Sequence, residues 1–411
     1  MSMDRSHNKP KLIFPVISDV HIKLDDNFNL EKFIHTLEQI NRVAPKQDAF
    51  VVVGDLTESG EIAEYDKFMA AYKTRKQAKA VSLMAIGNHD YWNGLSGEDA
   101  QNRFLEKTGM SSIYYHKVIN DYHFIILGTE DGITEGTFSS KQLEWLGEQL
   151  RKANADDPKK PIFVFHHQPM INTIYGSEWG FSENRDLFYN TMKEFPQVIA
   201  FSGHTHYPLD DPRIIHQKDF TSVGTSSGAY LYLENGRIQS EVPEGAHFLN
   251  QALIVEAYDS KVLIHRRDIQ KNDFIGEPFI INYPVKKQEF NYAEPRVKKA
   301  PFFEPGSVVS IVNEKTTSSC FTIMVTQAID SLLVHDYKVV IKRAETGETA
   351  NQSLAFSEFY KNPVPNPLIL QIDGLQPDTL YKIEVSALDS YGNLSSNSLN
   401  VLGRTKTLDI F

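Results

Sequence analysis

Residues 81–90 read VSLMAIGNHD, an apolar run that ends in a glycine and three polar residues. Such a run has the length and composition of a buried strand, and the polar cluster follows where a loop leaves it. Similar apolar runs occupy 12–18, 49–53, 124–127, 162–165 and 198–202. Amphipathic helical patterns lie between the runs, at 30–42, 61–73, 100–107, 140–153 and 184–194. Further β-rich runs at 222–227, 230–232, 252–257 and 261–268 complete the sheets. This alternation predicts a layered α/β domain.

Polar clusters follow five of the predicted strands. Each cluster alone is a common turn or capping motif, but ligands of open α/β sheets gather beyond the carboxyl ends of the strands. Five clusters at five strand ends therefore indicate one shared site. The clusters are Asp19-Val20-His21, Gly54-Asp55, Gly87-Asn88-His89-Asp90, His166-His167 and Gly203-His204-Thr205-His206.

The side chains in these clusters are metal ligands of one chemical kind. Alternate residues of an extended segment point the same way, so Asp19 with His21, and His204 with His206, are expected to aim at common points. Carboxylate, amide and imidazole groups suit divalent Mn, Fe, Zn or Co, whereas a structural zinc site favours thiolates. Seven such ligands exceed one tetrahedral ion, and two ions about 3.5–4 Å apart can share a carboxylate. The sequence therefore predicts two divalent ions.

Taken together, the five motifs resemble the calcineurin-like metallophosphoesterase family, and most closely its class III cyclic-nucleotide phosphodiesterase branch. The resemblance covers about residues 10 to 270. It implies a four-layer α/β/β/α sandwich of two mixed sheets with helices outside. By motif position, one ion is held by Asp19, His21 and His206, and the other by Asn88, His166 and His204, with Asp55 as the bridge. Purple acid phosphatases carry a tyrosine ligand after the Gly-Asp motif, which Leu56-Thr57 does not supply.

The resemblance also implies a mechanism, in which a metal-bridging hydroxide attacks phosphorus in line with the leaving oxygen. His89 is expected to stabilise the phosphoryl oxygens or protonate the leaving oxygen, with Asp90 orienting its ring. We expect a substrate pocket formed by Tyr91, Trp92, Asn93 and His167. Residues 172–186 form a long segment after His166, which suits a lid or simple aromatic packing equally.

The favoured function is hydrolysis of phosphodiesters, with 3′,5′-cyclic nucleotides as the first substrates to test. A phosphomonoesterase and a nucleotide pyrophosphatase with the same site remain alternatives, because the sequence has no motif for a particular base or alcohol. A different class of alternative is a non-catalytic protein that binds through its C-terminal domain.

The C-terminal part changes to short alternating strands without a helical pattern. Residues 374–389, GLQPDTLYKIEVSALD, resemble the fibronectin type III pattern, with Tyr381, Ile383, Val385 and Ala387 alternating onto one buried face. Tyr381 also suits a tyrosine corner. We therefore expect a catalytic domain at 10–283, a linker at 284–303 and an all-β immunoglobulin-like sandwich at 304–411. The sandwich is a candidate surface for homodimerisation or intramolecular docking.

Composition restricts the partners. The formal charge of −11 over 411 residues, without a basic stripe, disfavours a nucleic-acid polymer as partner. A small phosphate ester remains compatible, because bound cations dominate the local field. Cys320 is the single cysteine and is expected in the core, which excludes a disulfide within the chain. Residues 1–17 lack a signal-peptide pattern and no apolar run spans a membrane, so we expect a cytoplasmic protein.

Overall fold

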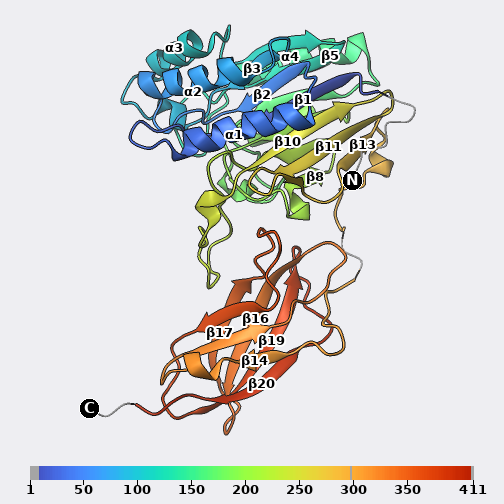
Figure 1. Cartoon of the computed structure of the whole chain (residues 1–411). Helices are drawn as coiled ribbons and strands as arrows, with labels where there is room; N and C mark the ends of the chain where they lie inside the picture. The colour runs from blue at the N-terminus through green and yellow to red at the C-terminus, as the bar shows by residue number, and fades with distance from the viewer. Residues whose placement is uncertain (1–8, 297–298, 409–411) are drawn as a thin grey trace. The chain divides into compact units, whose positions relative to one another are not determined.

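The computed structural model describes residues 9–296 and 299–408 (Figure 1). The chain divides into two compact units. The first contains residues up to Leu209 together with Arg213–Tyr232 and Gly245–Glu294, and the second contains Asp210–Pro212, Leu233–Glu244 and the residues from Pro295 onward. The boundaries 10–283, 284–303 and 304–411 stay predictions. Two earlier predictions fall partly outside the described residues. Residues 1–8 belong to the segment expected to lack a signal peptide, and residues 297–298 belong to the expected linker.

The first sheet of unit 1 contains seven strands in the order β12-β11-β10-β1-β2-β3, with β13 also pairing with β11. Strands β1, β2 and β3 are parallel, whereas β10 is antiparallel to β1, so the sheet is mixed. Its strands are β1 (Leu12–Ile17), β2 (Ala49–Val53), β3 (Val81–Ala85), β10 (Gln251–Ala257), β11 (Lys261–Asp268), β12 (Asp273–Phe274) and β13 (Phe279–Asn282).

The second sheet of unit 1 contains six strands in the order β4-β5-β6-β7-β9-β8. The inner strands β5, β6, β7 and β9 are parallel, and the edge strands β4 and β8 are antiparallel to their neighbours. This sheet is therefore mixed as well. Its strands are β4 (Tyr115–Ile119), β5 (Tyr122–Ile126), β6 (Ile162–His166), β7 (Val198–Ser202), β8 (Ile215–Gln217) and β9 (Thr221–Gly224).

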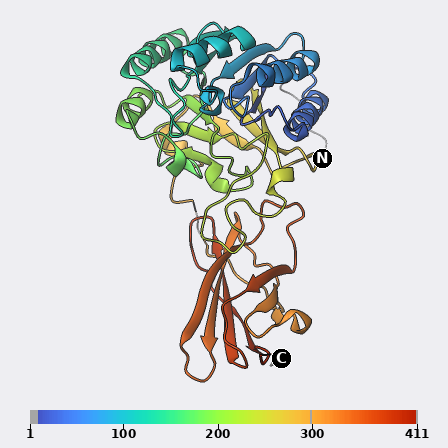
Figure 2. The ribbon, with the colours of Figure 1, turned by 90° about the vertical axis from the view of Figure 1, so that its left-hand side faces the viewer.

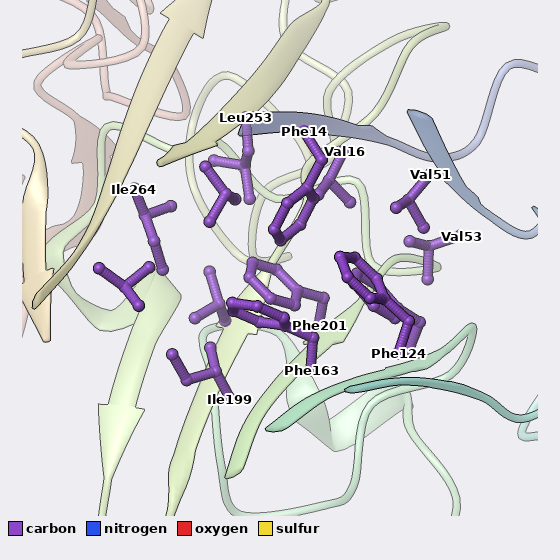
Figure 3. Packing of buried hydrophobic residues seen from close by; sticks show 14 of the residues in the cluster. Phe14, Val16, Val51, Val53, Phe124, Phe163, Ile199, Phe201, Leu253 and Ile264 are labelled. Atoms are coloured by element: carbon purple, nitrogen blue, oxygen red, sulfur yellow. The ribbon is translucent and has the colours of Figure 1, made fainter. Parts of the chain in front are cut away.

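Apolar side chains from both sheets meet in one core (Figure 3). Phe14 of β1 packs edge-on against Phe124 and Phe163 of the second sheet, with ring centroids 5.0 and 4.9 Å apart. Edge-to-face contacts of this kind add stabilisation beyond the buried area. The two sheets therefore pack face to face. This packing fixes the positions of their strand ends.

Helices cover the outer face of each sheet (Figure 2). Apolar residues of α1, α2 and α3 pack on the first sheet, and those of α4 and α5 pack on the second. The four-layer α/β/β/α prediction is therefore confirmed. The helices are α1 (Phe28–Val43), α2 (Ile62–Arg75), α3 (Gly97–Thr108), α4 (Ser140–Asp156) and α5 (Arg185–Met192). None of the helices in the described ranges has the length and apolar character needed to cross a membrane.

Several details of the predicted strands differ from the structure, and the short strands β8, β12 and β13 were not predicted. Residues 230–232 form no strand, because their backbone turns beside His206, with the Tyr232 amide donating to the His206 carbonyl at 3.1 Å. Strand β4 was not predicted, because its outward residues His116 and Lys117 interrupt the apolar run that marks the other strands.

The second unit contains an all-β sandwich of two sheets (Figure 1). One sheet has the order β14-β15-β18 and the other the order β17-β16-β19-β20, with antiparallel neighbours throughout. This three-plus-four arrangement is that of a fibronectin type III domain, and the fold prediction is confirmed. The strands are β14 (Val309–Ile311), β15 (Phe321–Val325), β16 (Val334–Arg343), β17 (Thr349–Phe356), β18 (Leu368–Ile372), β19 (Leu380–Asp389) and β20 (Leu399–Arg404).

Strand β19 carries the predicted alternation. Tyr381, Ile383, Val385 and Ala387 are all fully buried in the sandwich core. The Tyr381 hydroxyl accepts a hydrogen bond of 2.9 Å from the Gln376 amide, five residues upstream, as a tyrosine corner requires. Both predictions are confirmed, and Cys320 is buried as expected.

A buried histidine in the second unit sits among carboxylates. The Nδ1 atom of His335 lies 3.1 Å from Asp336, and its Nε2 atom lies 3.4 Å from Glu234 and 3.6 Å from Asp211. Arg237 pairs with the same Asp336 at 2.8 Å. Burial lowers the pKa of His335, but hydrogen bonds to Asp336 and Glu234 outweigh it and raise the pKa to about 9. His335 is therefore protonated in the folded unit at neutral pH.

This raised pKa predicts an alkaline loss of stability in the second unit. The contribution of His335 is fully present below its unfolded pKa of about 6.5 and is lost as pH rises through about 9. We expect calorimetry of the full chain to show the transition temperature of this unit falling over that range, as its free energy of unfolding decreases by on the order of 3 kcal/mol. In His335→Gln, the transition temperature should change much less with pH. If it changes as steeply with pH as in the wild type, the raised pKa does not belong to His335.

Candidate metal centre

The five polar clusters meet at the carboxyl ends of parallel strands from both sheets. Asp19 and His21 follow β1, and Asp55 and Asn88 follow β2 and β3. The His166-His167 pair ends β6, and His204 and His206 follow β7. Because the two sheets pack face to face, these loops converge, and the predicted gathering of the clusters is found.

The backbone at the site is turned sharply rather than extended. Asp19, His21, Asp55, His204 and His206 all have positive φ, between 48° and 70°. The expectation that Asp19 with His21, and His204 with His206, lie on extended segments is therefore wrong. Non-glycine residues adopt this left-handed conformation at a cost and mostly where function demands it. Here it turns two side chains of each loop towards the same point.

Glycines beside the ligand residues allow close approach of the loops. A Cβ atom on Gly54 would lie 2.3 Å from Nδ1 of His167, and Gly54 itself has a φ of +82°. A Cβ atom on Gly203 would lie 2.6 Å from Oδ2 of Asp19. Any larger residue at these two positions would displace a polar group of the site.

One group of ligand atoms joins Asp19, His21 and His206. The His206 Nε2 atom lies 3.2 Å from Oδ1 of Asp19 and 3.1 Å from Nε2 of His21. All three side chains are buried. Ligand atoms this close together could all bind one divalent ion.

A second group joins Asp55, His167 and His204. The His167 Nε2 atom lies 3.0 Å from Oδ2 of Asp55. The same Oδ2 atom lies 3.8 Å from Nε2 of His21, which belongs to the first group. Asp55 therefore stands between the two groups. Asn88 is buried in the loop after β3, and its Oδ1 accepts a hydrogen bond from Gln168 at 3.3 Å.

His166 does not join either group. Its Nδ1 donates to the carbonyl of Gln168 at 2.7 Å, and its ring packs against Phe138, Phe181 and Phe188 on the outer side of the sheet. Burial lowers its pKa to about 4. The expectation of a ligand at His166 and a pocket residue at His167 is thus reversed in the structure, where His167 faces the carboxylates.

The site fits divalent cations. Among the described residues, the buried Nε2 atom of His204 has no hydrogen-bond partner. The Nδ1 atom of His167 donates to the Val53 carbonyl at 2.8 Å, which orients Nε2 towards the carboxylates. Nitrogen and oxygen donors without thiolates suit hard or borderline ions. Buried acceptors without donors are what a cation site requires.

Residues 14–208 match the family model described as calcineurin-like phosphoesterase. The chain contains a calcineurin-like metallophosphoesterase domain. A probable glycerophosphodiester phosphodiesterase from Arcobacter nitrofigilis is 29% identical over 47% of this chain and 72% of its own length. A cAMP/cGMP dual specificity phosphodiesterase from Mycobacterium tuberculosis is 29% identical over 49% of this chain and 64% of its own length.

A solved purple acid phosphatase from yellow lupin seeds is also similar, with 17% identity and a TM-score of 0.49 over 67% of this chain and 55% of its own. The family model and the named relatives support a hydrolase that acts on phosphoric esters. The chain spans less than two thirds of the length of the mycobacterial protein.

In the metallophosphoesterase site, neighbouring charges shift the pKa values of Asp55 and His167 in the direction opposite to burial. Burial raises the pKa of Asp55, but His167, His89 and His21 outweigh it and hold that pKa below its usual range. Burial lowers the pKa of His167, but Asp55 and Asp19 outweigh it and raise the pKa to about 9. Without a cation, His167 therefore holds a proton between two carboxylates. A cation must displace that proton, so metal affinity rises with pH.

His89 occupies the open side of the site. Its amide donates to Oδ1 of Asp55 at 3.0 Å, and its Nδ1 donates to the Glu58 carbonyl at 2.8 Å. The ring lies 4.4 Å from the ring of His21 and 3.8 Å from the indole of Trp92. Trp92 is half exposed and thus forms part of the rim of the site. His89 is held beside the first ligand group without joining its hydrogen bonds.

Asp90 has a different partner from the one predicted. It accepts hydrogen bonds from the Thr57 hydroxyl at 2.7 Å, the Thr57 amide at 3.2 Å and the Gly87 amide at 3.0 Å. It therefore ties the loops after β2 and β3 together, and the Glu58 carbonyl orients His89. Burial and the charge of Asp55 raise the pKa of Asp90 to about 6.

Tyr91 and Asn93 also lie away from the predicted pocket surface. Tyr91 is buried, and its hydroxyl donates to the Thr129 carbonyl at 2.7 Å. The Asn93 amide donates to the Gly60 carbonyl at 3.1 Å. Both residues support the loop that carries Asn88 and His89, and of the three residues after Asp90 only Trp92 is exposed at the rim.

Two residues of the site escaped the sequence analysis. Glu58 lies 3.1 Å from Nδ1 of His21, so it orients that ring, and it also pairs with Lys23 at 3.4 Å. Gln168 connects Asn88 to the loop at Thr134. Neither belongs to a motif, although Glu58 follows Asp55 by three residues on the same loop.

A matched pair of variants distinguishes the adjacent histidines. His167→Ala should lower metal affinity by more than about 10–100-fold, because even groups that only orient ligands have effects of that size. His166→Ala should lower the melting temperature through lost packing and retain the metal in the folded fraction. Metal analysis and thermal melting of both variants test this. If His166→Ala loses metal and His167→Ala retains it, His166 rather than His167 is the ligand.

Proposed function

We propose that the metallophosphoesterase domain hydrolyses phosphodiesters with two divalent ions bound side by side. The first ion is held by Asp19, His21 and His206, and the second by Asn88, His167 and His204, with Asp55 between them. The observation that carries this proposal is the position of Oδ2 of Asp55, 3.0 Å from His167 of one group and 3.8 Å from His21 of the other. Mn, Fe, Zn or Co suit this donor set.

Two bound cations would supply a hydroxide nucleophile for in-line attack at neutral pH, because they lower the pKa of water from about 15.7. The residues of the chain provide the rest of the chemistry. Glu58 holds His21 at the Nδ1 side, and the Val53 carbonyl does the same for His167, so both Nε2 atoms face inward. His89 donates through Nδ1 to the Glu58 carbonyl, and its Nε2 would meet a phosphoryl or leaving oxygen.

The preference for diesters is supported by the relatives. One is named a probable glycerophosphodiester phosphodiesterase and another a cAMP/cGMP phosphodiesterase, so both names describe diester cleavage. A cytoplasmic location and a binding role of the sandwich stay predictions.

Hydrolysis of paired model substrates tests this function. With added Mn²⁺, we expect bis-(p-nitrophenyl) phosphate to be cleaved at least about tenfold faster than mono-(p-nitrophenyl) phosphate, and 3′,5′-cyclic AMP to be cleaved as well. Faster cleavage of the monoester would support the phosphomonoesterase alternative. Inactivity towards all three with metal bound would contradict the enzymatic proposal.

A further inference from the structure

A cavity lies on the outer face of the second sheet of unit 1, beside its edge strand β8. In the antiparallel pair of β8 and β9, Ile215 and Val223 face the core between the two sheets. The next pair along these strands, His216 and Ser222, therefore faces the opposite side, where α5 packs. Both residues line the cavity, and no metal ligand is among the residues that line it. The cavity is therefore separate from the metal centre.

The cavity has room for a small polar ligand. Its volume is about 170 Å³, whereas a single water molecule needs only about 10–15 Å³ of such space. Met170 and Phe220 form an apolar side of the cavity and belong to the core beneath α5. Arg185 of α5 and Lys218, which precedes β9, bring two cationic side chains to the same cavity. The charge of these two residues decides which ligand fits.

Arg185 brings a positive charge that has no partner in the described part of the chain. Its Nε atom is buried and has no hydrogen-bond partner among the described residues. Its guanidinium group forms no ion pair within residues 9–296 and 299–408. A buried donor without an acceptor costs free energy, and a guanidinium fork matches two oxygens of one oxyanion. Arg185 therefore suits an anion bound in the cavity.

The second cation, Lys218, is also without a counter-charge. Its Nζ atom lies 5.4 Å from the centre of the Tyr189 ring and forms no ion pair in the described ranges. The nearby carboxylate of Asp219 has other partners, because Oδ1 pairs with Lys287 at 2.8 Å and Oδ2 accepts from the Tyr189 hydroxyl. Asp219 and Lys287 therefore neutralise each other. Two positive charges remain at this cavity, although the formal charge of the chain is −11.

We propose that this cavity binds a phosphate group, either as the free ion or as part of a phosphomonoester. Such a group carries a charge of about −1.5 to −2 at neutral pH, which two unpaired cations balance. The fork of Arg185 and the hydroxyl of Ser222 supply hydrogen-bond donors for its oxygens. Hydrolysis of a phosphodiester releases a phosphomonoester, so the product of the proposed reaction has the chemistry that this cavity accepts. The binding site itself does not depend on that reaction.

Calorimetric titration of the chelator-treated full chain with inorganic phosphate tests the cavity without metal-bound phosphate. The wild type should bind phosphate with a Kd below about 1 mM. Arg185→Gln should weaken binding about 10- to 100-fold, because it removes charged hydrogen bonds. Lys218→Gln should weaken it about 2- to 5-fold, as expected for one exposed charge.

Two exposed cations of α4 provide matched controls. Arg151→Gln and Lys141→Gln remove the same charges from residues that do not line the cavity, and both should bind phosphate as the wild type does. Thermal melting shows whether each variant is folded. Lys218 is exposed, so Lys218→Gln tests the cavity even if Arg185→Gln does not fold.

A parallel titration with glycerol 3-phosphate distinguishes the two sources of phosphate. If both ligands bind and Arg185→Gln weakens both, the cavity accepts the phosphate of an ester. If only inorganic phosphate binds with this dependence on Arg185, the cavity takes the free ion. A wild type that binds neither ligand, or variants of Arg185 and Lys218 that bind as tightly as their controls, would overturn the proposal. The titration needs neither metal nor turnover, so failure of the proposed function would leave its result unchanged.

Discussion

Replacing Asp55 by asparagine is expected to lower the rate of phosphodiester hydrolysis by more than about 100-fold and to reduce bound metal below two ions per chain. The reason is the position of its Oδ2 atom, which lies 3.8 Å from Nε2 of His21 and 3.0 Å from Nε2 of His167. Oδ1 of Asp19 lies at the longer distances of 4.0 and 3.8 Å from the same two nitrogens. A neutral amide cannot balance two neighbouring cations as a carboxylate does. Changes to outer groups alone lower metal affinity or activity about 10–100-fold, so loss of the shared ligand should exceed that.

The measurement is metal content together with the hydrolysis rate of bis-(p-nitrophenyl) phosphate. Asp66→Asn is the matched control, because Asp66 is exposed and pairs with Lys107 at the surface. It should retain wild-type metal and activity. Two ions per chain and near wild-type turnover in Asp55→Asn would show that Asp55 does not join the two groups of ligands.

The second large effect concerns His89. His89→Ala is expected to lower kcat by about 10²–10⁴-fold, the usual range for a lost proton donor or acceptor at the reacting centre. Metal content should not change, because His89 donates to the Glu58 carbonyl and meets His21 only ring to edge. Steady-state kinetics should therefore show a large loss of kcat. Metal analysis of the same preparation should show unchanged metal content.

A histidine elsewhere in the chain provides the control. His35 lies on α1, where it pairs with Gln39 at 3.0 Å, and His35→Ala should leave kcat and metal content unchanged. If His89→Ala loses metal in proportion to activity, His89 is a ligand rather than a group that acts on the substrate.

The sequence predicted the fold of unit 1 well where strands were continuous apolar runs. Strands such as β2 and β7, with Val51 and Phe201, are buried on both faces, so their composition marks them without ambiguity. Residues 230–232 have a similar apolar composition, but they form no strand, and Tyr230 and Tyr232 pack their rings against His206. Composition cannot distinguish a strand from a loop that packs its rings around a site.

The sequence could not decide which residue of the His166-His167 pair faces the metal site. In β6, Phe163 and Phe165 face the core between the sheets, and His167 continues on that side beyond the strand. Val164 and His166 face the helices. Because both faces of β6 are buried, the alternation has no polar contrast that could assign the two histidines. Only the packing of the strand decided between them.

The backbone carbonyls that orient the histidines of the site could not be predicted from the sequence either. His89 and His167 are oriented by the carbonyls of Glu58 and Val53, which lie far from them in sequence. Carbonyls occur at every residue and leave no signal in the side-chain pattern. The prediction that Asp90 orients His89 failed for this reason, since a nearby carboxylate was the visible candidate.

Titration of metal into chelator-treated protein tests the central claim most directly. Mn²⁺ is added in steps, bound metal per chain is measured, and hydrolysis of bis-(p-nitrophenyl) phosphate is followed in the same samples. We predict saturation at two ions per chain, with activity appearing as the second ion binds. Full activity in metal-free protein, or saturation at one ion with full activity, would contradict the account.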